Sequence, residues 1–246
     1  MGTTLKMIIE YDGTRYQGFS TKKKSACIES KLQQAVRNVT GQSVQLFPAV
    51  KTEPAVHAAF QIVSFVLEGE VCPEKLSDLK KQLNDQLPAD IAVSGLERAD
   101  ARFVASLAAV SCTYTCRIAR SYTDALFRRP YVCVVSEKLD VGHMREAAEM
   151  LVGSHDFSGF SEGRTKKSTV RRLQKVSVEE EDGMILITLT ANSFLRHMPQ
   201  LLVGALLAAG RGECKTGEIL LILSGVKSAY PACPSYAFTL SDVKLR

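Results

Sequence analysis

The chain has 246 residues, of which 46% are apolar and 23% charged, as is usual for a globular protein with a sizeable core. No apolar run approaches the roughly 20 residues that a membrane-spanning helix needs, and the N-terminus lacks the basic and apolar segments of a secretory signal. Seven cysteines without a CxxC pair argue against a disulfide framework or a zinc site. These features predict a cytoplasmic protein that does not enter a membrane.

The net charge is +5, from 31 basic and 26 acidic residues, and three clusters of basic residues occur along the chain. A solvated charged surface explains any one cluster equally well. Three clusters, one interleaved with Ser and Thr, favour a partner with a phosphate backbone. The cluster residues are Lys22, Lys23, Lys24, Arg128, Arg129, Arg164, Lys166, Lys167 and Arg171, to which we add Arg196 from a later helix.

The first half of the chain alternates strand and helix patterns. LKMIIEY ends in the turn residues DG, and the helical pattern that Ser25 can cap stops at Gly41. Such an order predicts an antiparallel sheet with helices on one face, the α+β class. The expected strands cover 5–11, 43–47, 60–67 and 91–99, and the expected helices cover 25–41 and 72–88.

The second half predicts a similar arrangement, so we expect two domains, residues 1–105 and 106–246. A hairpin is expected to turn at Asp182–Gly183. Pro199 implies a kink or a late start in the last long helix. The expected elements are strands at 108–119 and in the hairpin 173–191, and helices at 141–153 and 194–212.

The loop AVKTEPAVHAA, residues 49–59, places a cation, a carboxylate and an imidazole close together: Lys51, Glu53 and His57. Pro54 restricts the backbone of Glu53, and a carboxylate held in a loop can act as a nucleophile or general base, although a plain surface acid is also consistent. His57 enters an apolar strand, as a core histidine does. Neither a G-x-S-x-G motif nor a phosphate-binding glycine loop occurs. The residues alone therefore indicate an α+β protein suited to RNA, with an acid in a loop.

Several stretches match one family in sequence order. EYDGTRYQGF resembles the Y-D-G-x-x-Y-x-G-[W/F] opening of the TruA family of tRNA pseudouridine synthases, and AVKTEPAVHA resembles its active-site loop A-G-R-T-D-A-G-V-H-A. LPADIAV, ARF followed by Tyr114, HDFSGF, TVRRL and SFLRHMPQLLVGALLAAGRG are similar to its later motifs. The resemblance covers nearly the whole chain.

The resemblance implies two ferredoxin-like halves that share an extended, mostly antiparallel sheet with a central RNA-binding cleft. It implies a homodimer that isomerises uridine to pseudouridine in the anticodon arm of tRNA, without metal or organic cofactor. The target base must leave its stack. Glu53 then stands at the catalytic aspartate, Lys51 at the arginine that holds the base out, and Tyr114 at the tyrosine that stacks on the base.

Three departures fall on this one site. Glu53 is one methylene longer than aspartate, Lys51 is a point charge in place of a planar guanidinium, and Gln200 occupies the position of an arginine that pairs with the aspartate. The two loop glycines are Val50 and Ala55 here, although only glycine adopts positive φ without strain. Two hypotheses follow: a pseudouridine synthase with a variant acid, and an inactive paralogue that binds or remodels RNA. A glycosidase is disfavoured because the loop has no second acid.

Overall fold

The structure is a computed structural model that describes residues 2–21, 27–163, 168–215, 217–226 and 228–246. The chain divides into two compact units. Unit 1 comprises Met1–Val110 and Leu240–Arg246, and unit 2 comprises Ser111–Thr239. The predicted boundary lies between residues 105 and 106, whereas the observed division follows Val110 and returns the final strand to unit 1.

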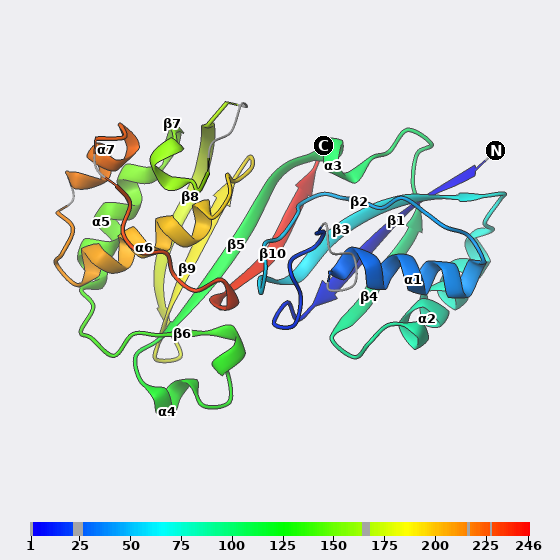
Figure 1. The fold of residues 1–246 in the computed structure, drawn as a ribbon, viewed down its shortest axis with the longest axis horizontal. Coiled ribbons are helices and arrows are strands. Elements are labelled where there is room, and N and C mark those ends of the chain that lie inside the picture. Colours follow the sequence, from blue (N-terminus) through cyan, green and yellow to red (C-terminus); the bar gives the residue numbers. More distant parts are fainter. Residues whose placement is uncertain (1, 22–26, 164–167, 216, 227) are drawn as a thin grey trace. The chain divides into compact units, whose positions relative to one another are not determined.

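Unit 1 contains a sheet with the strand order β4-β1-β3-β10, in which β1 pairs antiparallel with both β3 and β4 (Figure 1). The predicted order of strand, helix, strand, strand, helix, strand is confirmed. The elements are β1 (Gly2–Tyr11), α1 (Ile28–Thr40), β2 (Phe47–Pro48), β3 (His57–Glu68), η2 (Pro73–Lys75), α2 (Leu76–Gln86), β4 (Ile91–Arg98), α3 (Ala105–Ala108) and β10 (Phe238–Leu245).

Helix α1 packs against α2, and α2 packs on β4. The predicted stop of α1 is confirmed, because Gly41 adopts a left-handed conformation with φ 73° and donates its N–H to the Arg37 carbonyl. The predicted start is wrong: the residue before the helix is Cys27, which makes no side-chain cap, and Ser25 lies outside the described residues.

The predicted strand at 43–47 is also wrong in extent, because only Phe47–Pro48 pairs with β3. Its alternating pattern is nevertheless reflected in burial: Val44 and Leu46 are buried and Gln45 is exposed. At Val44 the carbonyl accepts a hydrogen bond from the side chain of Gln33 on α1. An alternation of apolar and polar residues indicates which side chains are buried, but it does not require the segment to pair with a neighbouring strand.

Unit 2 contains strands in the order β5-β9-β8-β7, and each neighbouring pair in this order is antiparallel. The short strand β6 also pairs with β5, in parallel. Helix α5 packs on β8 and against α6. The elements are β5 (Ala109–Ala119), α4 (Tyr122–Ala125), η3 (Arg129–Tyr131), β6 (Cys133–Val134), α5 (Val141–Leu151), β7 (Gly153–Asp156), η4 (Ser158–Phe160), β8 (Val170–Glu181), β9 (Met184–Ala191), α6 (Met198–Gly210), α7 (Glu218–Leu223) and η5 (Ser235–Ala237).

Two local predictions for unit 2 are confirmed. The hairpin turns at Asp182 and Gly183, whose φ values of 49° and 76° are those of a two-residue type I′ turn. Helix α6 starts late, at Met198, so that Pro199 lies in its first turn, where a missing N–H is harmless. Every residue of α6 is buried, which makes it the central helix of this unit. Together these features confirm the α+β class.

Candidate active site

The loop that carries Glu53 joins β2 to β3 in unit 1 and contains a tight turn. The carbonyl of Glu53 accepts a hydrogen bond from the N–H of Val56 at 3.2 Å, with Pro54 and Ala55 between them. Ala55 has φ 62°. Pro at the first central position and positive φ at the second define a type II turn. Ala55 therefore holds the backbone conformation that glycine adopts without strain, at the position where the family loop has glycine.

The YDGTRYQGF segment packs directly on this loop. Phe19 donates its N–H to the carbonyl of Thr52 at 3.0 Å, and Ala55 donates its N–H to the carbonyl of Tyr16 at 3.1 Å. The contact leaves no room for side chains: a Cβ on Gly18 would lie 2.6 Å from the Thr52 carbonyl oxygen, and one on Gly13 would lie 2.1 Å from that of Val56. The glycines of this motif thus allow two backbones to touch.

A third motif, LPADIAV, also contacts the YDGTRYQGF segment. Asp90, in LPADIAV, accepts hydrogen bonds from the Tyr16 hydroxyl at 2.8 Å and from Arg15 Nε at 3.0 Å. Burial, followed by the hydrogen bond to Asp90, raises the pKa of Tyr16. The Asp90 carbonyl also accepts the N–H of Asp12. LPADIAV therefore anchors the opening motif, which in turn packs on the Glu53 loop.

Within the loop the side chains differ in exposure. Lys51 is exposed and Glu53 is half-buried. His57 is buried, and its Nδ1 accepts the Gly13 N–H at 3.0 Å and lies 3.1 Å from Asp12 Oδ1. His57 is therefore a core histidine that braces the YDG turn, as its apolar neighbours indicated.

Tyr114 lies on β5 in unit 2, where it pairs in register with Leu189 of β9. Its side chain is 7% exposed and packs edge-to-face on Phe194, with ring centroids 5.4 Å apart and an angle of 78°. Phe194 lies in the motif SFLRHMP, four residues before α6 begins at Met198. The tyrosine is thus held in a fixed orientation by an aromatic neighbour.

Gln200 lies in the first turn of α6, also in unit 2, and is 3% exposed. The side-chain Nε2 of Gln200 donates to the Ser235 hydroxyl at 3.3 Å, and the backbone carbonyl of Gln200 accepts the Cys233 N–H at 2.9 Å. Unlike arginine, this neutral amide supplies no charge for pairing with a carboxylate. The exposed Arg196 lies four residues earlier, before the helix begins.

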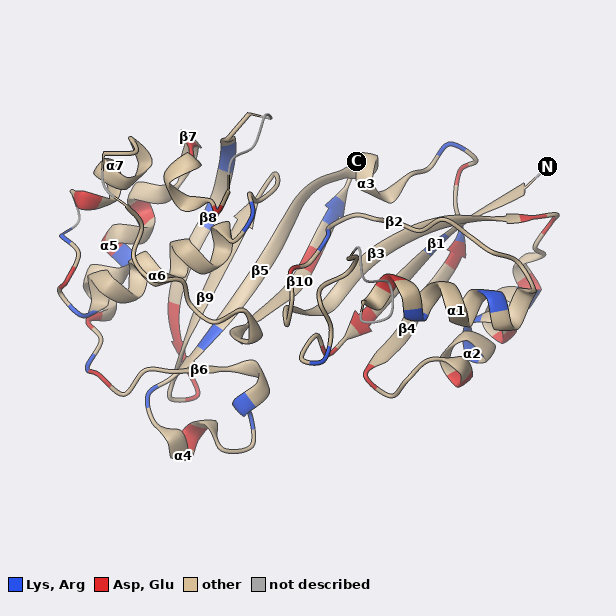
Figure 2. Cartoon of the chain, in the orientation of Figure 1, with Lys and Arg blue, Asp and Glu red and all other residues tan. Residues whose placement is uncertain are grey.

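Of the predicted RNA-binding residues, Arg128 and Arg129 are exposed. Arg171 is half-buried on β8; its guanidinium donates to the carbonyls of Ser168 and Val170, and burial lowers its pKa. Basic and acidic residues occur on the elements of both units, and β8 carries a basic pair at its start and the acidic run 179–181 at its end (Figure 2). Six predicted residues lie outside the described part of the chain: Lys22, Lys23, Lys24, Arg164, Lys166 and Lys167.

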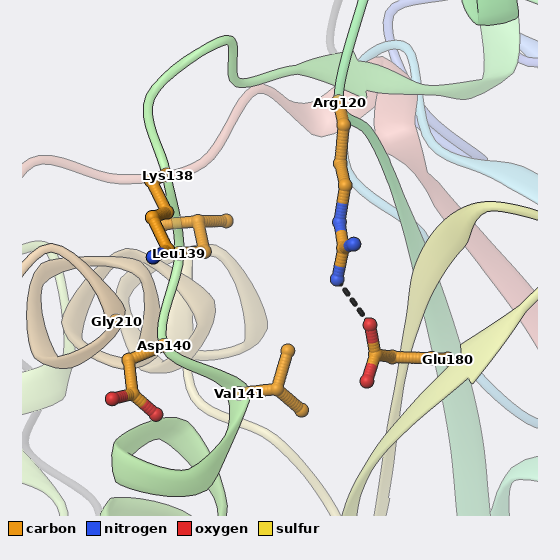
Figure 3. A pocket seen from close by; sticks show the side chains of 7 residues that line it. All are labelled: Arg120, Lys138, Leu139, Asp140, Val141, Glu180 and Gly210. Carbon is orange, nitrogen blue, oxygen red and sulfur yellow. Dashed lines mark hydrogen bonds and ion pairs between the residues drawn. The ribbon is translucent and has the colours of Figure 1, made fainter.

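A pocket of about 520 Å³ lies in unit 2, apart from all these residues (Figure 3). Arg120 and Glu180 form an ion pair on one side, and Lys138 and Asp140 line the other. Two basic and two acidic side chains cancel, so the pocket gives no electrostatic preference for phosphate. We therefore assign it no part in RNA binding.

The described residues contain no cluster of three or more His, Cys, Asp or Glu side chains placed to hold a metal ion. Nor does any helix in this part of the chain combine the length and the apolar character that crossing a bilayer demands.

Comparison with known proteins identifies the family. The family model described as tRNA pseudouridine synthase matches residues 147–244. The chain is 33% identical to tRNA pseudouridine synthase A of Acetivibrio thermocellus, covering 91% of each sequence, and 32% identical to tRNA pseudouridine synthase A 1 of Clostridium tetani, covering 98% of each. It is also 34% identical to tRNA pseudouridine synthase A 2 of Bacillus cereus, covering 89% of each. The chain therefore belongs to the tRNA pseudouridine synthase A family, whose loop and opening motif meet in unit 1.

Proposed function

We propose that this protein isomerises uridine to pseudouridine in tRNA, with Glu53 as the catalytic carboxylate. Relatives named as tRNA pseudouridine synthases match this chain over nearly their whole length. The observation that carries the proposal is the turn at Glu53, because Ala55 adopts φ 62° although it lacks the freedom of glycine. A loop that had lost its role would be expected to relax to an unstrained conformation.

In the proposed reaction the Glu53 carboxylate acts at the target nucleoside, either by attacking or by deprotonating its sugar. The bond between C1′ and N1 breaks, the uracil rotates, and C1′ forms a new bond to C5. The proton on C5 leaves and N1 gains one, so that the product is an isomer of the substrate. Tyr114 stacks on the extruded base, and Lys51 helps to hold it out of the helix.

The second candidate function is RNA binding without isomerisation. It is favoured by Gln200, which is neutral, buried and hydrogen-bonded to Ser235 at the position of the family arginine. An error of about 1 Å in the position of a catalytic group can reduce a rate on the order of a hundredfold. Glu53 also extends one carbon–carbon bond further than aspartate. If Lys51 or Arg196 supplies no replacement charge, the loop would hold RNA without turnover.

We also propose that the two units correspond to the two halves of the family fold, that the protein forms a homodimer, and that it acts in the cytoplasm. The candidate tRNA contacts are the exposed Arg128, Arg129 and Arg196 and the half-buried Arg171. Charged side chains of this kind contact phosphates and position the nucleic acid.

The experiment uses tRNA transcripts carrying tritium at uracil C5, which is released when C5 forms its new bond. The wild-type protein should release tritium, and Glu53→Gln should abolish release while tRNA affinity stays within about twofold, since the amide keeps the shape but not the charge. Release that is unchanged in Glu53→Gln would show that another group is the acid. Binding of tRNA by the wild-type protein without release would establish the second candidate.

A further inference from the structure

A buried polar network lies beneath the loop and includes residues outside the reaction described above. Gln61 on β3 is 0% exposed. Its Nε2 donates to the Val50 carbonyl at 2.6 Å, and its Oε1 accepts the Val50 N–H at 3.3 Å and the Ile62 N–H at 3.1 Å. The amide cannot be flipped without placing its NH₂ group against two N–H donors. Gln61 therefore binds both polar backbone groups of the residue that precedes Lys51.

Tyr11, the last residue of β1, holds the other side of Lys51. Its hydroxyl is 2.7 Å from Thr52 Oγ1 in a buried hydrogen bond, and it also hydrogen-bonds Gln61. Thr52 is 4% exposed. The network thus runs without interruption from Val50 through Gln61 and Tyr11 to Thr52, the residue before Glu53.

Glu53 is consequently flanked by restrained backbone on both sides. On its N-terminal side, Thr52 is held by Tyr11 and by the N–H of Phe19. On its C-terminal side, the turn bond to Val56 and the bond from Ala55 to Tyr16 close the loop. When one member of a buried hydrogen-bond network is removed, its neighbours are disturbed as well, because their polar groups are left without a partner and without water to replace it.

We propose that Tyr11 and Gln61 are positioning residues for Glu53, acting through Thr52 and Val50. The proposal rests on the proposed catalytic role of Glu53. Removing either group should let the loop shift by a fraction of an ångström, which lowers kcat and leaves KM nearly unchanged, because neither side chain is exposed to bind RNA.

The test compares Tyr11→Phe and Gln61→Leu with Thr3→Val. Thr3 is a matched control: it is a buried hydroxyl at the opposite end of β1, bonded to the Gly69 carbonyl and the Val71 N–H. The two network variants should reduce kcat in the tritium assay by on the order of tenfold to a hundredfold, with KM within about twofold. Thr3→Val should be destabilised without a change in kcat.

A second readout does not depend on activity. Amide hydrogen exchange at Val50, Ala55 and Val56 should rise at least about tenfold in Tyr11→Phe and remain as in wild type in Thr3→Val. The double variant Tyr11→Phe and Thr52→Val should lower kcat no more than the more affected single variant does, because both substitutions remove the same hydrogen bond. Additive losses would overturn the proposal.

The readouts separate the two ideas. A wild-type protein that releases no tritium, but whose loop amides behave as described, would refute the proposed function and retain the positioning role. Tritium release that is insensitive to Tyr11→Phe, together with unchanged exchange, would refute the positioning role alone. Because Tyr11→Phe removes a single oxygen atom, the test does not depend on whether Gln61→Leu folds.

Discussion

Ala55 donates its backbone N–H to the carbonyl of Tyr16 at 3.1 Å while its own φ is 62°. This bond joins the opening motif of the chain to the turn that follows Glu53. A left-handed alanine costs roughly 1–2 kcal/mol, so the surrounding contacts must maintain it. Pro54 contributes by fixing its own φ near the value that a type II turn requires.

Ala55→Gly should therefore stabilise the protein by about 0.5–1 kcal/mol, less than the full strain because glycine also gains entropy in the unfolded chain. The measurement is the free energy of unfolding in urea. Ala59→Gly is the matched control: Ala59 is exposed on β3 and has no positive φ. That control should be destabilised by about 0.5–1 kcal/mol, and equal effects of the two changes would contradict the strain argument.

Gly13→Ala should be destabilising by about 1–3 kcal/mol, because its Cβ would lie 2.1 Å from the backbone oxygen of Val56. The loop must move to accept it, so tritium release should fall as well. Gly217→Ala serves as control, since a Cβ there meets nothing within 4 Å and φ is not positive. Wild-type stability in Gly13→Ala would mean that the loop and the YDG turn are not in contact.

Stability should decline at alkaline pH because of Tyr11. Burial raises the pKa of Tyr11 from 10.0 to about 12. Between these values the unfolded chain loses the proton and the folded protein keeps it, so unfolding is favoured by up to roughly 1.4 kcal/mol per pH unit. The free energy of unfolding, measured from pH 9 to 12, should fall more steeply in wild type than in Tyr11→Phe. Tyr16, whose pKa is also raised, accounts for part of the remaining slope.

Arg171→Gln should weaken tRNA binding and reduce the slope of log Kobs against log salt concentration by about 1, the value for one phosphate contact. The control is Lys6→Gln, which removes a cation that is paired with Glu97 at 2.5 Å and belongs to none of the predicted clusters. If both variants keep the wild-type slope, the phosphates are bound elsewhere.

Only Cys72 among the seven cysteines has an exposed side chain. Burial raises the pKa of Cys112 to about 12, and the Sγ atoms of Cys116 and Cys233 lie 3.7 Å apart in the interior. Iodoacetamide at pH 8 should therefore modify Cys72 well before the rest in the folded protein. Peptide mass spectrometry measures the order, and Cys72→Ser should remove the fast phase.

Local chemistry explains which elements were predictable. The stop of α1 at Gly41 and the hairpin turn at Asp182–Gly183 depend on backbone preferences of single residues, which are visible in the sequence. The segment 43–47 shows the limit, since its alternation described burial but not strand pairing. Short elements such as β6 and α7 escaped prediction because two to six residues carry too little periodicity to be recognised.

The sequence by itself determined the α+β class and the family, and it predicted Glu53 as the acid, because these depend on residue types and their order. It also showed that Val50, Lys51, Ala55 and Gln200 depart from the family pattern. Only the tertiary structure decided that Ala55 keeps a glycine-like φ, that Asp90 binds Tyr16, that Gly13 reaches the loop, and that Gln61 holds Val50. Such contacts depend on which segments, far apart in the sequence, come together in the folded sheet, and the backbone preferences of single residues do not specify that pairing.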